Sequence, residues 1–214
     1  MRQMKEWSQS PAATVLRVGG QLLLDRLTRP KATGRDDVPT SIDAITPAWW
    51  TDVLCADVPG AEVTAHSLVS ASKGTHQRHR FALSYNDAGH AAGLPTAVFT
   101  KTLPTLVTRM MGGYNGTSRA EGRFFMRIRP DMEIETPTGY HAAFDRTTLA
   151  GINVLEDIVA TKNATFCDFG TEVTRSMAED MVDLLAILHG HRYDDPRLDT
   201  ELRWVANFAD WFRI

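Results

Sequence analysis

Residues 96–101, Thr-Ala-Val-Phe-Thr-Lys, are central to the fold, because they form a β-branched, apolar strand that ends in a lysine. Residues 62–70 and 77–85 have the same strand character, and the small-residue stretch 71–76 between them predicts a hairpin. Residues 86–95 are rich in turn formers and lead into the lysine strand. Three strands are therefore expected in succession.

A helix is expected next, followed by two more strands. Thr117 or Ser118 can cap a helix over residues 118–129, and Pro130 marks its end. The apolar residues predicted to share one face of this helix are Ala120, Phe124, Phe125 and Ile128. The strands that follow are predicted at 140–144 and 151–155, with a turn at 145–148. The pattern predicts an α+β fold, with a mostly antiparallel five-stranded sheet and one helix across it.

Helices are expected at both ends of the chain. Residues 12–27 predict a helix followed by a polar linker, and Thr40 or Ser41 can cap a short helix near 47–54. After Thr171 a longer amphipathic helix carries Val173, Met177, Met181, Leu184, Leu185 and Leu188. A last amphipathic stretch contains Leu202, Val205, Phe208, Ala209 and Phe212, and the apolar end at Ile214 indicates truncation. The predicted regions are 1–45, 46–158 and 159–214.

Composition limits the functional classes. A hydrophobic content of 43% supports a sizeable core, and a formal charge of −3 gives no overall attraction to nucleic acid or anionic lipid. Charged residues interrupt the first 27 residues, so no signal peptide or membrane span is expected there. Cys55 and Cys167 are far apart and are expected to be free, buried thiols in a cytoplasmic protein.

Lys101 and Glu121 are the first candidate site residues. A lysine at the end of a strand can place its ammonium on the phosphates of a nucleotide, and a carboxylate on the following helix can hold that ammonium in place. Glu121 follows Lys101 by 121 − 101 = 20 residues and lies on the predicted helix. Alone, each would be read as a solvated side chain; together and in this order, they predict a functional pair.

Three further segments carry a family resemblance. Residues 154–158, Val-Leu-Glu-Asp-Ile, resemble the Leu-Leu-Glu-Asp-Leu hinge of the aminoglycoside-phosphotransferase and ecdysteroid-kinase-like (CHK kinase-like) families of the protein-kinase-like superfamily. Residues 121–125 resemble their Glu-x-x-Phe-Tyr helix, and residues 184–189 their Leu-Ala-x-Leu-His helix. The resemblance covers about residues 61–198 and leaves out 1–45.

The resemblance implies a nucleotide-binding lobe that takes ATP and Mg²⁺. Lys101 and Glu121 would position the phosphates, and the turn with Ser72, Gly74 and Thr75 would cover them through its backbone. Leu155 would border adenine, the Glu156 carbonyl would accept from its amino group, and the Ile158 amide would donate to a ring nitrogen. The alternative for 154–158 is a strand whose two carboxylates cap or solvate a turn.

The chain departs from the family where the chemistry would occur. These families need a His-x-Asp catalytic loop and a second aspartate for magnesium, whereas His189-Gly190-His191 lacks the aspartate and belongs to the earlier helix. The other aspartates in this part of the chain, Asp194, Asp195, Asp199 and Asp210, have no matching context. We therefore expect an N-lobe and the first helices of a truncated C-lobe, so catalysis by this chain is left open.

Two functions remain open. The first is ATP-dependent phosphorylation of a hydroxyl group on a small molecule, with the acceptor unspecified. The second is a non-catalytic nucleotide-binding or interaction module, including a homodimer through the uncovered C-lobe surface near Phe208 and Phe212.

Other site types have weaker support. A metal site could be formed by His189, His191, Asp194 and Asp195, but solvated surface is the favoured interpretation of these residues. The same holds for nucleic-acid binding through 77–80 or through Arg123, Arg127 and Arg129. No P-loop, dinucleotide-binding turn or esterase elbow occurs in the sequence.

Overall fold

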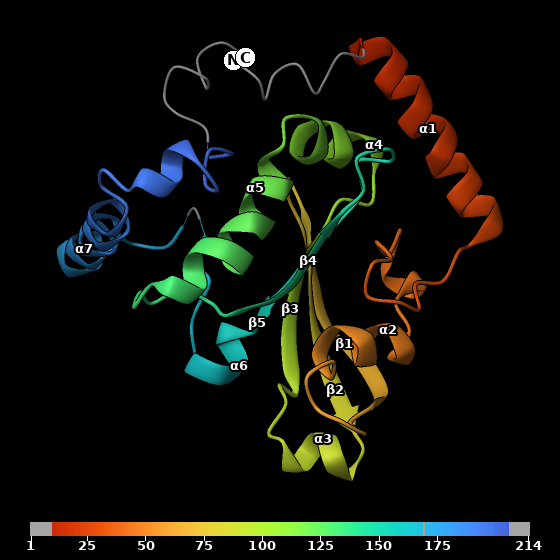
Figure 1. Ribbon diagram of the computed structural model, residues 1–214, viewed down its shortest axis with the longest axis horizontal. Helices are drawn as coiled ribbons and strands as arrows, with labels where there is room; N and C mark the ends of the chain where they lie inside the picture. Colours follow the sequence, from red (N-terminus) through yellow and green to blue (C-terminus); the bar gives the residue numbers. More distant parts are fainter. Residues whose placement is uncertain (1–9, 169, 206–214) are drawn as a thin grey trace. The chain divides into compact units, whose positions relative to one another are not determined.

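A five-stranded antiparallel sheet forms the centre of the fold in the computed structural model, which describes residues 10–168 and 170–205 (Figure 1). The spatial order of the strands is β1-β2-β3-β5-β4. Their bounds are β1 Val63–Lys73, β2 Gln77–Tyr85, β3 Ala97–Thr102, β4 Gly139–Phe144 and β5 Gly151–Glu156. The predicted α+β class and the antiparallel five-stranded sheet are confirmed.

The two faces of the sheet have different chemistry. Lys101 pairs in register with Arg78 of β2 on one side and Asn153 of β5 on the other. Directly opposed residues point to the same face of a sheet, so these three side chains share one face. Phe81 and Val98, which are also paired, belong to the opposite face and are buried.

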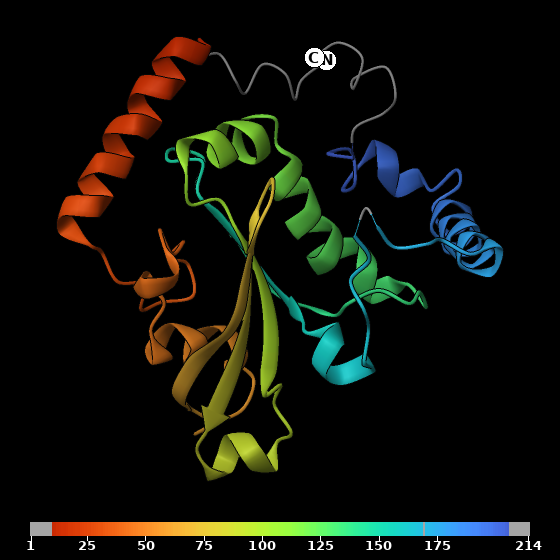
Figure 2. The ribbon, with the colours of Figure 1, turned by 180° about the vertical axis from the view of Figure 1, so that it is seen from behind.

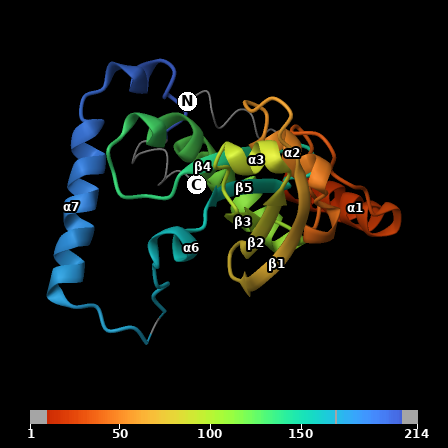
Figure 3. The same cartoon turned by 90° about the horizontal axis from the view of Figure 1, so that it is seen from below.

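Helix α2 (Pro47–Leu54) packs on the apolar face of the sheet, as Figure 3 shows from below. Trp49 and Trp50 are fully buried, and their rings pack edge to face with centroids 4.9 Å apart. The side chain of Thr46 caps the helix by accepting from the Trp49 amide, so the predicted caps Thr40 and Ser41 were wrong. Ser41 instead precedes a short 3-10 helix, Ile42–Ala44.

The predicted N-terminal helix is α1 (Pro11–Thr28). Ser10 caps it, Pro11 occupies its first turn, and it ends at Arg29, whose φ of 47° is left-handed. After this helix the chain enters the core, because Ala32 and Ile45 are buried and form a parallel bridge. The segment expected to be a polar linker therefore contributes to the packing around α2.

The helical segment between β3 and β4 lies over β4 and β5 on the lysine-bearing face (Figures 1 and 2). It consists of α4 (Leu106–Thr108), a π-helical turn (Arg109–Tyr114), α5 (Thr117–Arg123), a second π-helical turn (Phe124–Ile128) and a 3-10 turn (Arg129–Asp131). Ser118 and Gly122 are buried in α5, whereas Ala120 is exposed. The predicted apolar face of this helix was therefore wrong at Ala120, and Gly122 is the residue that packs against the sheet instead.

Helices α3 (Asp87–Ala91) and α6 (Ile158–Lys162) are among the short helices that were not predicted. Asn86 caps helix α3, and Asp157 caps helix α6. Each capping side chain accepts hydrogen bonds from backbone amides of the first turn. With five residues each, these two helices are too short to show helical periodicity in the sequence.

The described chain divides into two compact units, residues 10–130 with 137–165 and residues 131–136 with 166–205. The second unit contains α7 (Arg175–His191) and a 3-10 helix (Pro196–Asp199). Arg192 and Arg197 both bind Asp195 and Asp131 there, at distances between 2.9 and 3.4 Å. The predicted apolar residues Phe208, Ala209 and Phe212 and the chain end at Ile214 lie outside the described residues.

Two predictions based on composition can be compared with the structure. Cys55 is buried as expected, whereas Cys167 is exposed, so the prediction of a buried thiol was wrong for Cys167. Within the described residues, no helix has both the length and the apolar character needed to span a bilayer.

Candidate functional site

Lys101 and Glu121 form an ion pair between β3 and α5. Lys101 is held by the central strand of the sheet, and Glu121 projects from the helix packed on the same face. Both side chains are about one-quarter exposed, at 24% and 23%, so an ammonium held in a defined position still faces solvent. The structure thus brings together the two residues that the sequence paired.

Asn153 is a third member of this group. The Asn153 side-chain amide donates to the second carboxylate oxygen of Glu121 at 3.3 Å, and Asn153 is only 3% exposed. A Cβ at Gly122 would lie 2.7 Å from the Asn153 Oδ1 atom, so glycine is what allows α5 to approach the sheet this closely. Asn153 was not among the predicted site residues; as a polar residue inside the apolar run 151–155 it stands out in the sequence, but its partner does not.

Basic side chains extend the site along β2. Arg78 is opposite Lys101, and Arg80 is two residues further along the same face. The Arg80 Nε atom donates to Asp157 at 2.8 Å, whereas Arg78 is exposed. Two adjacent strands therefore place three cationic groups on one face of the sheet, which favours an anionic ligand.

The turn between β1 and β2 is shorter than predicted. Strand β1 continues to Lys73, so Ser72 lies in the strand opposite Arg78, and the assignment of residues 71–73 to the turn was wrong. In the remaining turn, Gly74 donates its amide to the His76 carbonyl at 3.0 Å. Gly74 and Thr75 are exposed, and a Cβ at Gly74 would make only ordinary contacts of 3.7 Å or more.

His76 ends this turn beside the ion pair. A Cβ at Gly112 would lie 3.2 Å from the His76 Nε2 atom, so the imidazole rests against the bare backbone of the π-helical turn. Burial lowers the pKa of His76; Glu121 opposes this shift, while Lys101 and Arg78 reinforce it. The Nε2 atom is buried without a hydrogen-bond partner in the described residues.

The predicted hinge residues lie at the end of β5 and the start of α6. Leu155 is 4% exposed. The Glu156 amide donates to the Thr138 carbonyl at 2.8 Å, and the Glu156 carboxylate accepts from the Thr138 amide and the Thr161 hydroxyl. As the first residue of α6, Ile158 has an amide that this helix cannot pair internally.

Asp157 connects this segment to the basic face. Its carboxylate accepts from the Val159 and Ala160 amides at 3.2 and 3.4 Å and from Arg80. The side chain is 2% exposed. The carboxylates of Glu156 and Asp157 therefore perform the turn-stabilising role that the sequence left open as the alternative.

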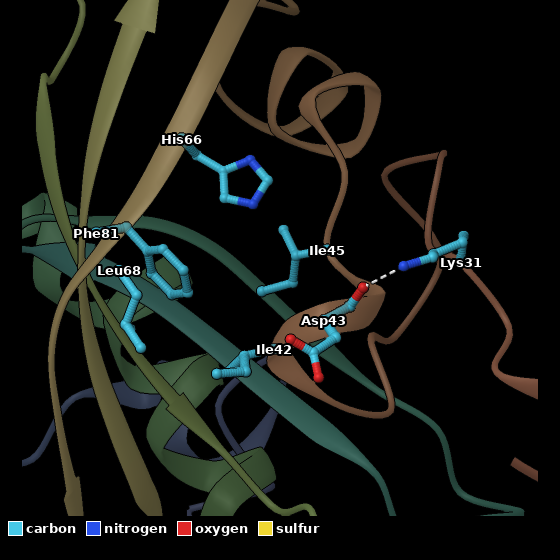
Figure 4. Close-up of a pocket in the computed structure, with 7 residues that line it drawn as sticks. All are labelled: Lys31, Ile42, Asp43, Ile45, His66, Leu68 and Phe81. Atoms are coloured by element: carbon cyan, nitrogen blue, oxygen red, sulfur yellow. Dashed lines mark hydrogen bonds between the residues drawn. The ribbon is translucent and has the colours of Figure 1, made fainter. Parts of the chain in front are cut away.

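A hollow of about 390 Å³ lies on the opposite face of the sheet (Figure 4). Its lining combines the segment before α2 with strands β1 and β2, through Lys31, Ile42, Asp43, Ile45, His66, Leu68 and Phe81. The Lys31 ammonium donates to the Asp43 carbonyl at 2.6 Å, as drawn in Figure 4. The hollow includes no predicted site residue, so it is separate from the Lys101 site.

Residues 10–168 and 170–205 contain no group of three or more His, Cys, Asp or Glu side chains that could hold a metal ion. Comparison of the chain with protein-family models, with curated proteins and with solved structures finds no match. Function must therefore follow from the chain's own residues.

Proposed function

We propose that residues 46–158 form a protein-kinase-like nucleotide-binding lobe, and that the protein serves ATP-dependent phosphorylation of a hydroxyl group on a small molecule. The Lys101–Glu121 ion pair is the observation that carries this proposal. In kinases a strand lysine paired with a helix glutamate holds the nucleotide phosphates, and both must be in place for transfer.

The supporting group around the pair favours a binding role over a surface salt bridge. An exposed ion pair contributes little to stability and needs no further partners. Here Glu121 is also held by the buried Asn153, and α5 approaches the sheet through Gly122. This arrangement fixes the ammonium and leaves it accessible, as positioning a phosphoryl group requires.

The electrostatics of the face are consistent with a polyphosphate. Arg78 is exposed beside Lys101, and both side chains can approach the same anion from adjacent strands. Ser72 lies opposite Arg78 on β1 and continues this row, and in the turn that follows Thr75 is exposed and Gly74 leaves the backbone open to a ligand. Leu155, the Glu156 carbonyl and the Ile158 amide would then hold the adenine.

Magnesium would enter this site bound to the phosphates of the nucleotide. When bound to ATP, the ion would neutralise phosphate charge. The residues of this lobe would bind and orient the phosphates. No described residue is assigned as the base that would take the proton of the acceptor hydroxyl.

A non-catalytic interaction module is the second candidate, and α7 favours it. This helix has no buried side chain, and Met181, Val182 and Leu185 are each more than half exposed. An apolar helix face of this kind typically packs on a partner.

The test is ATP binding measured by calorimetry, with and without magnesium, on the 214-residue chain. Lys101→Ala removes the phosphate contact at a strand end, so we expect ATP affinity to fall at least tenfold without loss of fold. Lys31→Ala is the matched control, because it deletes an ammonium on the other face of the sheet.

Equal ATP affinity in wild type and Lys101→Ala would contradict the assignment of the phosphate site. Absence of ATP binding by a folded wild-type chain would remove the nucleotide-binding proposal and favour the interaction module. Adenosine is a useful second ligand, because the hinge contacts predict that it binds without depending on Lys101.

A further inference from the structure

His76 is the histidine that the β1–β2 turn carries to the edge of the Lys101 site, and the family resemblance assigns it no role. The next residue, Gln77, pairs with Lys73 of β1 and Thr102 of β3, so His76 lies at the same end of β3 as Lys101. The sheet register fixes Gln77, and His76 is the last residue of the short turn before it.

The imidazole is held closely but is incompletely bonded. Its Nε2 side faces Gly112, where a Cβ would come within 3.2 Å, and the same Cβ would lie 2.9 Å from Leu103. The Nδ1 atom has only a long contact of 3.5 Å with the Thr75 hydroxyl, and Nε2 has no partner in the described residues. A buried polar atom without a partner is unfavourable, so a ligand that supplies one gains affinity.

The charges around the ring identify the ligand chemistry. Glu121 of α5, Lys101 of β3 and Arg78 of β2 all act on it, while Gly112 and Leu103 contribute no charge. With one carboxylate already engaged by Lys101 and two cations nearby, the position favours an added anion. A phosphate group bound by Lys101 would be such an anion.

We propose that His76 is a phosphate-contacting residue, which donates a ring N–H to the polyphosphate of the nucleotide bound at Lys101. This inference rests on the proposed nucleotide site and adds a specificity residue to it. A donor from the turn would make recognition depend on the phosphate chain, whereas adenosine would not reach it. The exposed Gly74 and Thr75 allow the short turn to adjust as the phosphates enter.

The test compares ATP and adenosine binding by calorimetry in wild type, His76→Gln and His90→Gln. His90 on α3 is the control, because it lies outside the Lys101 site. Gln offers only a neutral amide donor and cannot be protonated, so loss of the charge on the donor predicts about five- to tenfold weaker ATP binding in His76→Gln, with adenosine affinity unchanged and His90→Gln equal to wild type.

A second readout uses the imidazole of the wild-type protein. In NMR titrations the pKa of His76 should rise when ATP is added and stay unchanged with adenosine, because only a phosphate stabilises the charged ring. This measurement holds even if His76→Gln does not fold.

The outcomes separate the two proposals. Lys101-dependent ATP binding that is unaffected by His76→Gln, with no change in the ring pKa, leaves the nucleotide site standing and overturns the role of His76. Equal losses for ATP and adenosine would show that His76 only supports the fold. Absence of ATP binding by folded wild type removes both proposals.

Discussion

Asp157→Ala is expected to destabilise the protein more than removal of an ordinary surface carboxylate. The Asp157 side chain is 2% exposed, caps α6 through two amides and binds Arg80 at 2.8 Å. The substitution therefore removes a helix cap and leaves Arg80 without its carboxylate. Because Arg80 is 24% exposed, water can partly replace that partner.

The magnitude follows from these contacts. Loss of an N-cap side chain costs about 1 kcal/mol, and loss of a hydrogen bond to a charged group costs about 1.5–3 kcal/mol. Partial hydration of Arg80 places the second contribution near its lower end, so the expected loss of unfolding free energy is about 3 kcal/mol. For a chain of this length, that corresponds to a fall in Tm of about 6–12 °C.

Thermal and urea unfolding followed by circular dichroism provide the assay, with two variants that separate the contributions. Asp157→Asn keeps an oxygen for the cap and removes the charge, so it should lose about 2 kcal/mol. Arg80→Met leaves the carboxylate buried without its cation. The double variant Asp157→Ala/Arg80→Met should lose less unfolding free energy than the sum of the two single variants, by at least about 1 kcal/mol. Strict additivity, or a loss below about 0.5 kcal/mol in Asp157→Ala, would refute the reasoning.

Three other substitutions give distinct outcomes. Gly122→Ala brings a Cβ within 2.7 Å of Asn153, so about 1–3 kcal/mol of unfolding free energy and part of the ATP affinity should be lost. The control Gly20→Ala places its Cβ in open space within a helix, so urea unfolding should show a gain of about 0.5–1 kcal/mol. Gly74→Ala should change stability by less than about 0.5 kcal/mol but weaken ATP binding in calorimetry, since only a ligand needs the bare backbone there. Burial lowers the pKa of His141 to about 4, so the unfolded chain takes up its proton first and stability should fall as pH drops from about 6.5 to 4. His141→Gln should flatten that part of the pH profile of unfolding; an unchanged profile would contradict it.

The elements that the sequence predicted well are those with a local signal. The period-two pattern located β2 at Gln77–Tyr85 without error, and the apolar residues at helical spacing located α1 within one residue at each end. Asn86 and Asp157 were present as caps, but the five-residue helices after them carry no periodicity. Helix periodicity also misassigned the buried face of α5, because Gly122 packs by having no side chain.

The candidate site was predictable only in part, because its geometry depends on sheet order. Lys101 and Glu121 could be paired from element order alone, since one strand and the next long helix suffice. Asn153 could not be placed, because pairing consecutive strands would put β4 beside β3, whereas β5 lies between them. That insertion brings Asn153 into register with Lys101, and hence to Glu121. The carboxylate is thus held by two groups that are 153 − 101 = 52 residues apart in sequence, Lys101 on one strand and Asn153 on the next strand in space. Replacing Asn153 with aspartate would test this dependence most directly, because a second carboxylate beside Glu121 should weaken its hold on Lys101 while changing the side-chain volume very little.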